Sequence, residues 1–150
     1  MVEDCTFCRI IRGVEHGVVV EEDEEYLVLM DRHPYNPGHN LVIPKKHYKT
    51  LLDMPRSEVG RLFERVWLVA RATVKALEAD GVHIGQNNGR AARQVIDHVH
   101  VHIIPRFYND TEDGSWPARK SMPVEEMKRL AEQIRQQILA YKEELANSSY

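Results

Sequence analysis

Three histidines alternate with β-branched apolar residues in the segment 98–103, and this pattern constrains the fold more than any other stretch. Successive side chains of a strand point to opposite faces, so the imidazoles of His98, His100 and His102 are expected on one face. The valines and the isoleucine between them share the other face, which can pack in a core. Three adjacent imidazoles fill a core poorly, so their face needs an open cleft or a bound group.

The pattern alone allows three interpretations of this histidine face. An ordinary exposed strand is the least favoured, because histidine seldom serves as simple filling. A second interpretation is a metal site, since histidines two apart on one strand can hold zinc. A third is nucleophilic catalysis, in which an imidazole attacks an electrophile and is later displaced by water. The spacing does not separate the last two.

The two cysteines of the chain, Cys5 and Cys8, form a Cys-x-x-Cys pair near its start. The segment 1–4 is acidic through Glu3 and Asp4 and is followed by no apolar stretch, so we expect no signal peptide and a cytoplasmic location. A structural disulfide is not expected in a reducing compartment. A redox Cys-x-x-Cys pair usually lies at the start of a helix that follows a strand, whereas this pair lies close to residue 1. The pair is therefore interpreted as half of a zinc site whose other ligands lie elsewhere.

Composition limits the classes of protein to consider. A chain of 150 residues suits one domain, 1–150, with a hydrophobic core. The net charge of −3 argues against a protein that coats nucleic acid. No apolar run approaches the roughly 20 residues of a membrane span, so no membrane partner is expected.

Hydrophobic periodicity predicts an α+β fold with an antiparallel sheet. Apolar positions recur every three or four residues after Pro55, which predicts a long helix that ends at Gly81 and presents one apolar stripe. The acidic run 21–25 is interpreted as a solvated turn rather than a functional patch. The expected strands are 18–21, 26–31, 40–44, 82–86 and the histidine strand, with a helical turn over 5–13 and a last helix from Met122.

Two segments resemble the histidine triad (HIT) nucleotide hydrolases and transferases. One is the His-x-His-x-His run, and the other is Pro-Gly-His-Asn-Leu-Val-Ile-Pro-Lys-Lys-His at 37–47. The chain is identified as a member of this family over residues 4–106, while the C-terminal loop and helix, 107–150, carry a less specific signal. The resemblance implies a HIT fold of about five antiparallel strands with one long helix and a C-terminal helix. It also implies a two-fold homodimer, with the Trp67 helix and the triad-side strands as its interface.

The resemblance assigns the catalytic histidines. The central one, His100, would attack the α-phosphorus of a nucleotide and form a nucleotidyl-histidine that water cleaves. His102 would contact the phosphate and leaving-group oxygen, and His98 is the first histidine of the triad. His39 matches an additional supporting histidine. The implied substrates are purine nucleotide derivatives, either dinucleoside polyphosphates or adenosine phosphoramidates, with no organic cofactor. The alternative is a nucleotide-binding regulatory protein with little turnover, which would not need an intact triad.

The same resemblance implies the nucleotide contacts. Asp31 would accept hydrogen bonds from the ribose hydroxyls, although an aspartate that caps a loop is the alternative. Asn87 and Gln94 match polar residues that face the α-phosphate. Val95 stands where many members carry Ser or Thr, which removes a hydroxyl donor and leaves the leaving-group preference open. The residues that match the apolar base slot are Phe7, Ile10, Leu29 and Leu41.

Many bacterial and archaeal-type members with an N-terminal Cys-x-x-Cys bind zinc, and the resemblance implies the same ligands in this chain. They are Cys5, Cys8, His47 and the first triad histidine, His98. Two thiolates and two imidazoles make a closed tetrahedral site, so the metal would be structural rather than catalytic. It would pin the N-terminal turn over the triad strand and fix the orientation of the His98 ring.

Overall fold

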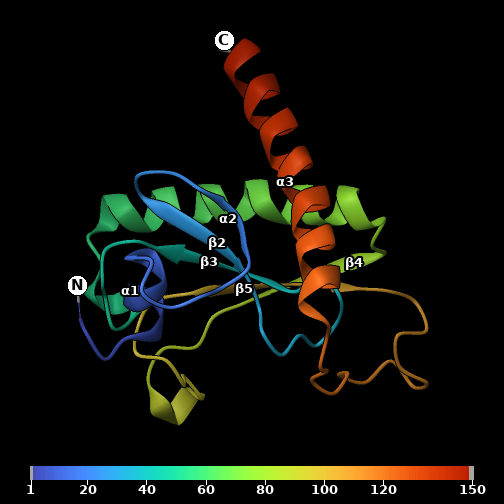
Figure 1. Ribbon diagram of the computed structural model, residues 1–150, viewed down its shortest axis with the longest axis horizontal. Coiled ribbons are helices and arrows are strands. Elements are labelled where there is room, and N and C mark those ends of the chain that lie inside the picture. The colour runs from blue at the N-terminus through green and yellow to red at the C-terminus, as the bar shows by residue number, and fades with distance from the viewer. Residues whose placement is uncertain (1, 149–150) are drawn as a thin grey trace.

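The computed structural model describes residues 2–148 and has the expected α+β architecture (Figure 1). Five antiparallel strands form one sheet in the order β1-β2-β3-β5-β4, so the prediction of fold class is confirmed. The strands are β1 (Val19–Glu22), β2 (Tyr26–Met30), β3 (Asn40–Pro44), β4 (Gly81–Gly85) and β5 (Val101–Arg106). The helices are α1 (Thr6–Ile11), α2 (Arg56–Leu77) and α3 (Val124–Asn147), with short 3₁₀ turns at Leu51–Asp53 and Arg90–Ala92.

Both faces of the sheet are covered, which explains why β2 and β3 are buried along their whole length. Alternate side chains point to opposite faces. Val28 and Val42 pack in a large core with α2 and α3, whereas Leu29 and Leu41 pack in a smaller core with α1. Figure 1 shows α2 and α3 as the long helices and α1 as the short one beside β2 and β3. The candidate site lies on the α1 side.

The histidine segment enters the sheet later than expected. β5 begins at Val101, so His98 and His100 precede the ladder. The N–H of Val99 donates to the carbonyl of Tyr48 at 2.8 Å, outside the ladder of β3 and β5. The alternation nevertheless persists through the extended segment, because the apolar residues 99, 101 and 103 all pack in the large core.

Helix α2 differs from its prediction at its end and on its surface. It ends at Leu77, its C-cap Glu78 is a left-handed residue with φ of 51°, and Gly81 begins β4 instead. The expected single stripe divides into two apolar faces. Leu62, Val66 and Val69 are buried on one face, whereas Phe63 and Trp67 on the other are 37% and 49% exposed. A second apolar face on α2 therefore remains open.

The acidic run 21–25, which begins in β1, is not simply a solvated turn, and this corrects the expectation. Glu21 is buried and forms ion pairs with Arg65 of α2, at 3.1 Å, and with Lys142 of α3. Asp23 also pairs with Arg65. A buried carboxylate needs such partners, and here they tie both long helices to the β1–β2 hairpin.

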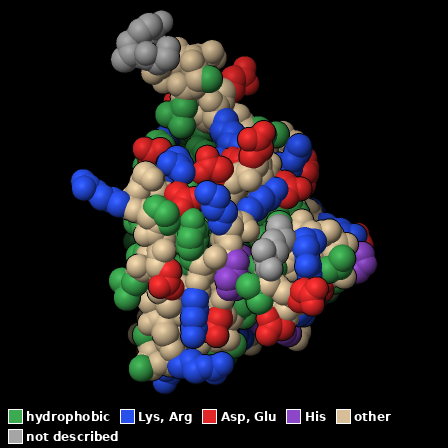
Figure 2. Space-filling model, turned by 90° about the vertical axis from the view of Figure 1, so that its left-hand side faces the viewer, with side chains coloured by type: hydrophobic (Ala, Val, Ile, Leu, Met, Phe, Trp, Pro, Cys, Tyr) green, Lys and Arg blue, Asp and Glu red, His purple; other side chains and the backbone are tan. Residues whose placement is uncertain are grey.

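Charged side chains of both signs are interspersed on the face shown in Figure 2. The C-terminal part of α3 projects from the rest of the molecule (Figures 1 and 2). Among residues 2–148, no helix has both the length and the apolar content needed to cross a membrane.

Candidate functional site

A cleft of about 830 Å³ on the α1 side of the sheet is lined by His100 and His102. The pairing of β3 with β5 sets Leu41 opposite His102, so the apolar and the imidazole walls adjoin. His39 and His98 are buried outside this lining. All the predicted nucleotide contacts line the cleft, namely Phe7, Ile10, Leu29, Asp31, Leu41, Asn87 and Gln94.

The tautomer of His100 follows from one hydrogen bond. Its Nδ1 lies 2.7 Å from the backbone carbonyl oxygen of His98, and a carbonyl can only accept. The proton therefore resides on Nδ1, and Nε2 keeps its lone pair. Burial lowers the pKa of His100, which favours the neutral ring at pH 7. A neutral imidazole with a free Nε2 is the form that a nucleophile requires.

His39 orients His102 from behind the cleft. The N–H of Tyr35 donates to Nδ1 of His39 at 3.1 Å, so the proton of His39 resides on Nε2. That Nε2 lies 2.9 Å from Nδ1 of His102, which must accept, and His102 then carries its own proton on Nε2. Burial lowers the pKa of His39 to about 4 and that of His102 to about 3. Both rings are therefore neutral at pH 7 and act as hydrogen-bond donors through Nε2.

The loop before β3 sets the position of His39. Gly38 has a φ of 97°, a conformation that L side chains rarely adopt. A Cβ at this position would also lie 2.1 Å from Cδ1 of Leu77. The left-handed backbone therefore favours glycine at the position that precedes His39.

Asp31 follows β2 and lines the cleft, close to the hydrogen-bonded pair of His39 and His102. Its Oδ1 accepts from the N–H of His33 at 2.8 Å, and its Oδ2 lies 3.4 Å from Nε2 of His39. Oδ1 also lies 3.3 Å from a guanidinium nitrogen of Arg119. Arg119 was not predicted as a site residue, and no motif or periodicity in its loop marks it. The contact joins residues 88 positions apart, which only the tertiary fold brings together.

The two predicted amides at the cleft differ in their surroundings. Gln94 is buried, and its Oε1 accepts from the N–H of Gly89 at 2.7 Å while its Nε2 donates to the carbonyl of Lys49 at 2.6 Å. Both polar atoms of the Gln94 side chain are therefore bonded to backbone groups, and these bonds stabilise the loop that contains Gly89. Asn87 makes one long bond, 3.3 Å, to the carbonyl of Arg93. Val95 is 83% exposed at the cleft and offers no hydroxyl donor.

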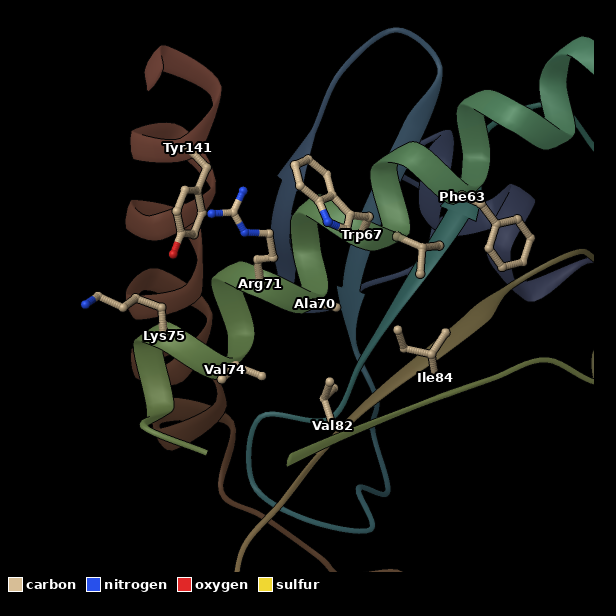
Figure 3. Close-up of a pocket in the computed structure, with 10 residues that line it drawn as sticks. Phe63, Trp67, Ala70, Arg71, Val74, Lys75, Val82, Ile84 and Tyr141 are labelled. Atoms are coloured by element: carbon tan, nitrogen blue, oxygen red, sulfur yellow. The ribbon is translucent and has the colours of Figure 1, made fainter. Parts of the chain in front are cut away.

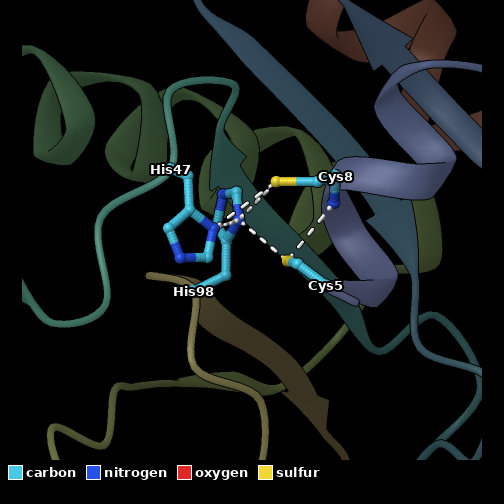
Figure 4. Close-up of side chains that lie close together, drawn as sticks. All are labelled: Cys5, Cys8, His47 and His98. Atoms are coloured by element: carbon cyan, nitrogen blue, oxygen red, sulfur yellow. Dashed lines mark hydrogen bonds between the residues drawn. The ribbon is translucent and has the colours of Figure 1, made fainter. Parts of the chain in front are cut away.

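The four predicted metal ligands converge beside the cleft (Figure 4). Their donor atoms all lie within 4.8 Å of one another. Nδ1 of His98 lies 3.3 Å from Sγ of Cys5, 3.6 Å from Sγ of Cys8 and 3.1 Å from Nδ1 of His47. Nδ1 of His47 in turn lies 3.4 Å from Sγ of Cys8. Cys5 is the N-cap residue of α1 and Cys8 lies within that helix, while His47 follows β3 and His98 precedes β5.

The chemistry of these donors fits zinc. The edges of a tetrahedron with zinc–sulfur and zinc–nitrogen bonds of ordinary length are about 3.3–3.8 Å, close to the distances found here. Nε2 of His98 donates to the carbonyl of Pro44 at 2.8 Å, so the Nδ1 that faces the thiols carries a lone pair. Burial raises the pKa of the Cys5 thiol, and a cation between the four donors would favour its thiolate. All four donors can therefore bind one ion.

Comparisons with known proteins agree with this geometry. The HIT domain family model matches residues 12–109. An adenylylsulfatase of Arabidopsis thaliana is 46% identical over 107 residues, which is 71% of this chain and 54% of that protein. The chain thus spans about half of that relative's length. An adenosine 5'-monophosphoramidase of Schizosaccharomyces pombe is 36% identical over 135 residues, 89% of this chain and 98% of the relative.

Solved structures extend the likeness to the whole fold. A hypothetical histidine triad nucleotide-binding protein of Sulfolobus tokodaii has a TM-score of 0.87 and 38% identity, covering 96% of this chain and 98% of that one. A zinc-bound histidine triad family protein of Mycobacterium smegmatis has a TM-score of 0.82 and 31% identity. The match covers 93% of this chain and 96% of the M. smegmatis chain.

Proposed function

Because the chain belongs to the histidine triad (HIT) family, we propose that it hydrolyses purine nucleotide derivatives at the α-phosphorus through an intermediate on His100. The observation that carries this proposal is the bond from Nδ1 of His100 to the carbonyl of His98, which leaves Nε2 as a nucleophile. The names of the Arabidopsis and S. pombe relatives support a nucleotide hydrolase in general.

The proposed reaction has two steps. Nε2 of His100 forms a bond to the α-phosphorus, and the bond from phosphorus to the leaving group breaks with its electron pair. Nε2–H of His102 donates a hydrogen bond to the phosphoryl or leaving-group oxygen, where negative charge develops. Water then attacks the phosphorus, the P–N bond breaks, and its electron pair returns to Nε2 of His100. The products are the nucleoside monophosphate and the leaving group, and the proton of the water passes to solvent.

Nucleotide binding is assigned to the rest of the cleft. The carboxylate of Asp31 would accept hydrogen bonds from the ribose hydroxyls. The purine would lie among the apolar side chains of the smaller core, where burial of its ring is favourable. Gln94 holds the loop that carries Asn87, so this loop would face the α-phosphate through Asn87 and backbone N–H groups. The four base-slot residues are Phe7, Ile10, Leu29 and Leu41.

Cys5, Cys8, His47 and His98 are proposed to hold one structural zinc ion. The ion would supply a cross-link between α1 and the triad segment and would not touch the substrate. The zinc-bound M. smegmatis neighbour supports this assignment. His98 links the proposed metal site to the proposed nucleophile. Its ring faces the thiol of Cys5, and its backbone carbonyl accepts the hydrogen bond from Nδ1 of His100.

A second copy of the chain is the proposed partner. The second apolar face of α2 adjoins β4, which is an edge strand of the sheet. Figure 3 shows Phe63 and Trp67 on α2 together with Val82 and Ile84 on β4. These side chains line a hollow of about 670 Å³. Ile84 is 44% exposed. Exposed apolar patches beside an unpaired strand edge are typical of protein interfaces, and a two-fold dimer would cover both.

A substrate panel tests the proposed activity. Purified protein is incubated with diadenosine tri- and tetraphosphate, adenosine phosphoramidate, an acyl adenylate and adenylyl sulfate, and AMP release is measured for each. We expect hydrolysis of at least one compound, with kcat/KM that identifies the preferred leaving group. AMP binding without turnover on any of them would instead favour a nucleotide-binding regulatory protein.

A further inference from the structure

The segment 107–123, called the strap below, joins β5 to α3 and runs beside the cleft. Most of it lies beyond the residues that the family model matches. Its first turn is anchored by Asp110, which accepts from Arg106 at 2.7 and 2.9 Å and from Asn36 at 2.8 Å. Its far end is anchored by the N–H of Lys120, which donates to the carbonyl of Pro34 at 2.7 Å. Both anchors fix the strap against the loop between β2 and β3.

Arg119 of the strap contacts this loop at three points. Its guanidinium donates to the carbonyl of His33 at 2.6 Å and lies 3.3 Å from Oδ1 of Asp31. It also lies over the ring of Tyr35, 4.4 Å from the ring centroid. A planar guanidinium can donate and stack at the same time, which the compact ammonium of lysine cannot do.

These contacts continue to the catalytic histidines. The ring of Tyr35 is stacked on His39, with centroids 5.6 Å apart and planes 12° apart. The backbone N–H of Tyr35 also fixes the tautomer of His39. Arg119 therefore touches both the proposed ribose-binding carboxylate and the residue that orients His39. It also lines the cleft.

The two oxygens of the Asp31 carboxylate have different neighbours. The guanidinium of Arg119 lies beside Oδ1, while Oδ2 faces His39. The charged donor at Oδ1 therefore fixes the orientation of the carboxylate.

We propose that Arg119 is a positioning residue for ribose recognition, which holds the Asp31 carboxylate in the orientation that accepts the ribose hydroxyls. This inference rests on the proposed function, since it names a determinant of affinity within the same site. It predicts that loss of Arg119 affects the recognition of hydroxyls more than the binding of the rest of the nucleotide.

The test compares AMP with 2',3'-dideoxy-AMP by calorimetry on four proteins. They are the wild type, Arg119→Ala, Arg119→Lys and the control Arg129→Ala, which removes an exposed arginine of α3 that pairs with Glu126. Wild type and control should bind AMP about tenfold or more tightly than the dideoxy compound, the usual effect of lost hydrogen bonds to a charged group. In Arg119→Ala this ratio should fall to about twofold or less, with dideoxy-AMP affinity little changed. Arg119→Lys should recover part of the ratio.

The outcomes separate the two levels of the proposal. A wild-type ratio retained in Arg119→Ala, even with lower thermal stability, would assign Arg119 a structural role and overturn this inference alone. A wild type that does not distinguish the two nucleotides would overturn the ribose role of Asp31 as well. Unchanged binding of dideoxy-AMP to Arg119→Ala shows that the variant folds and that its cleft is intact.

Discussion

Nδ1 of His100 donates to the backbone carbonyl of His98 at 2.7 Å, and this bond joins the candidate metal centre to the candidate nucleophile. The ring of the same His98 faces Cys5 and His47 through Nδ1. A change at the metal centre that moves His98 also moves the acceptor that fixes the tautomer of His100. A metal ion held by these donors would thus act on the His100 ring through His98 without contacting the substrate.

The metal assignment predicts about one zinc ion per chain. The double variant Cys5→Ser/Cys8→Ser should lose it and melt at a lower temperature, because metal binding contributes to folding. Metal analysis and thermal melting measure both effects, with His83→Gln as a control on β4 that retains zinc. Activity should fall only as α1 loosens, since a closed site is not catalytic. Metal-free protein with a Cys5–Cys8 disulfide would contradict the assignment.

The ribose assignment predicts that Asp31→Ala weakens AMP binding by about 1–3 kcal/mol, the typical effect of a lost hydrogen bond to a charged group. The reason is that its carboxylate is the acceptor proposed for the hydroxyls. The same variant should bind 2',3'-dideoxy-AMP nearly as well as wild type does. Calorimetry measures both affinities, and equal AMP affinity in variant and wild type would remove Asp31 from the ribose site.

The buried histidines predict a loss of stability in mild acid. The pKa of His39 is about 4 in the folded protein and about 6.5 when unfolded. Between these values the unfolded chain binds a proton that the folded chain does not, so stability is present above pH 6.5 and is lost as the pH falls toward 4. His102, with a pKa of about 3, acts in the same direction.

His39→Gln should therefore reduce the pH dependence of stability. Glutamine can retain a donor toward His102 but cannot be protonated. Urea unfolding at pH 7 and pH 5, at matched zinc content, measures the free energy of unfolding of both proteins. The wild type should lose more stability than the variant between these pH values. Parallel losses would show that His39 is not the group responsible.

The dimer assignment predicts that Trp67→Glu yields monomers, because it places a charge in the proposed apolar interface. Leu52→Glu changes an apolar residue that is more exposed than Trp67 and lies on a separate 3₁₀ turn, and it should leave the dimer intact. Sedimentation velocity measures the state of each protein. A wild type that is monomeric, or a Trp67→Glu variant that remains dimeric, would exclude this interface.

The sequence predicted features that depend on local pattern. Strand β3 has the expected bounds, and the alternation around His100 places valines in the core and imidazoles away from it. These results follow from side-chain periodicity and motif spacing, which are local properties. The convergence of Cys5 with His98 came from family resemblance, because no local pattern relates residues so far apart.

Features set by tertiary packing were missed. The helix end at Glu78 uses a left-handed non-glycine residue, which composition does not reveal. Glu21 belongs to an acidic run that looks solvated until Arg65 and Lys142 approach it. Arg119 lies in a loop without periodicity and reaches the cleft only because the strap is anchored at both ends.

The nucleotidyl-histidine is the central claim, and trapping it is the most direct test. The preferred substrate is mixed with enzyme, quenched within one turnover, and the tryptic peptide carrying residues 98–102 is examined by mass spectrometry. The account predicts one adenylyl group on His100, absent from His100→Ala, which should still bind AMP but lose turnover. An adduct on another residue, or near wild-type hydrolysis by His100→Ala, would contradict it.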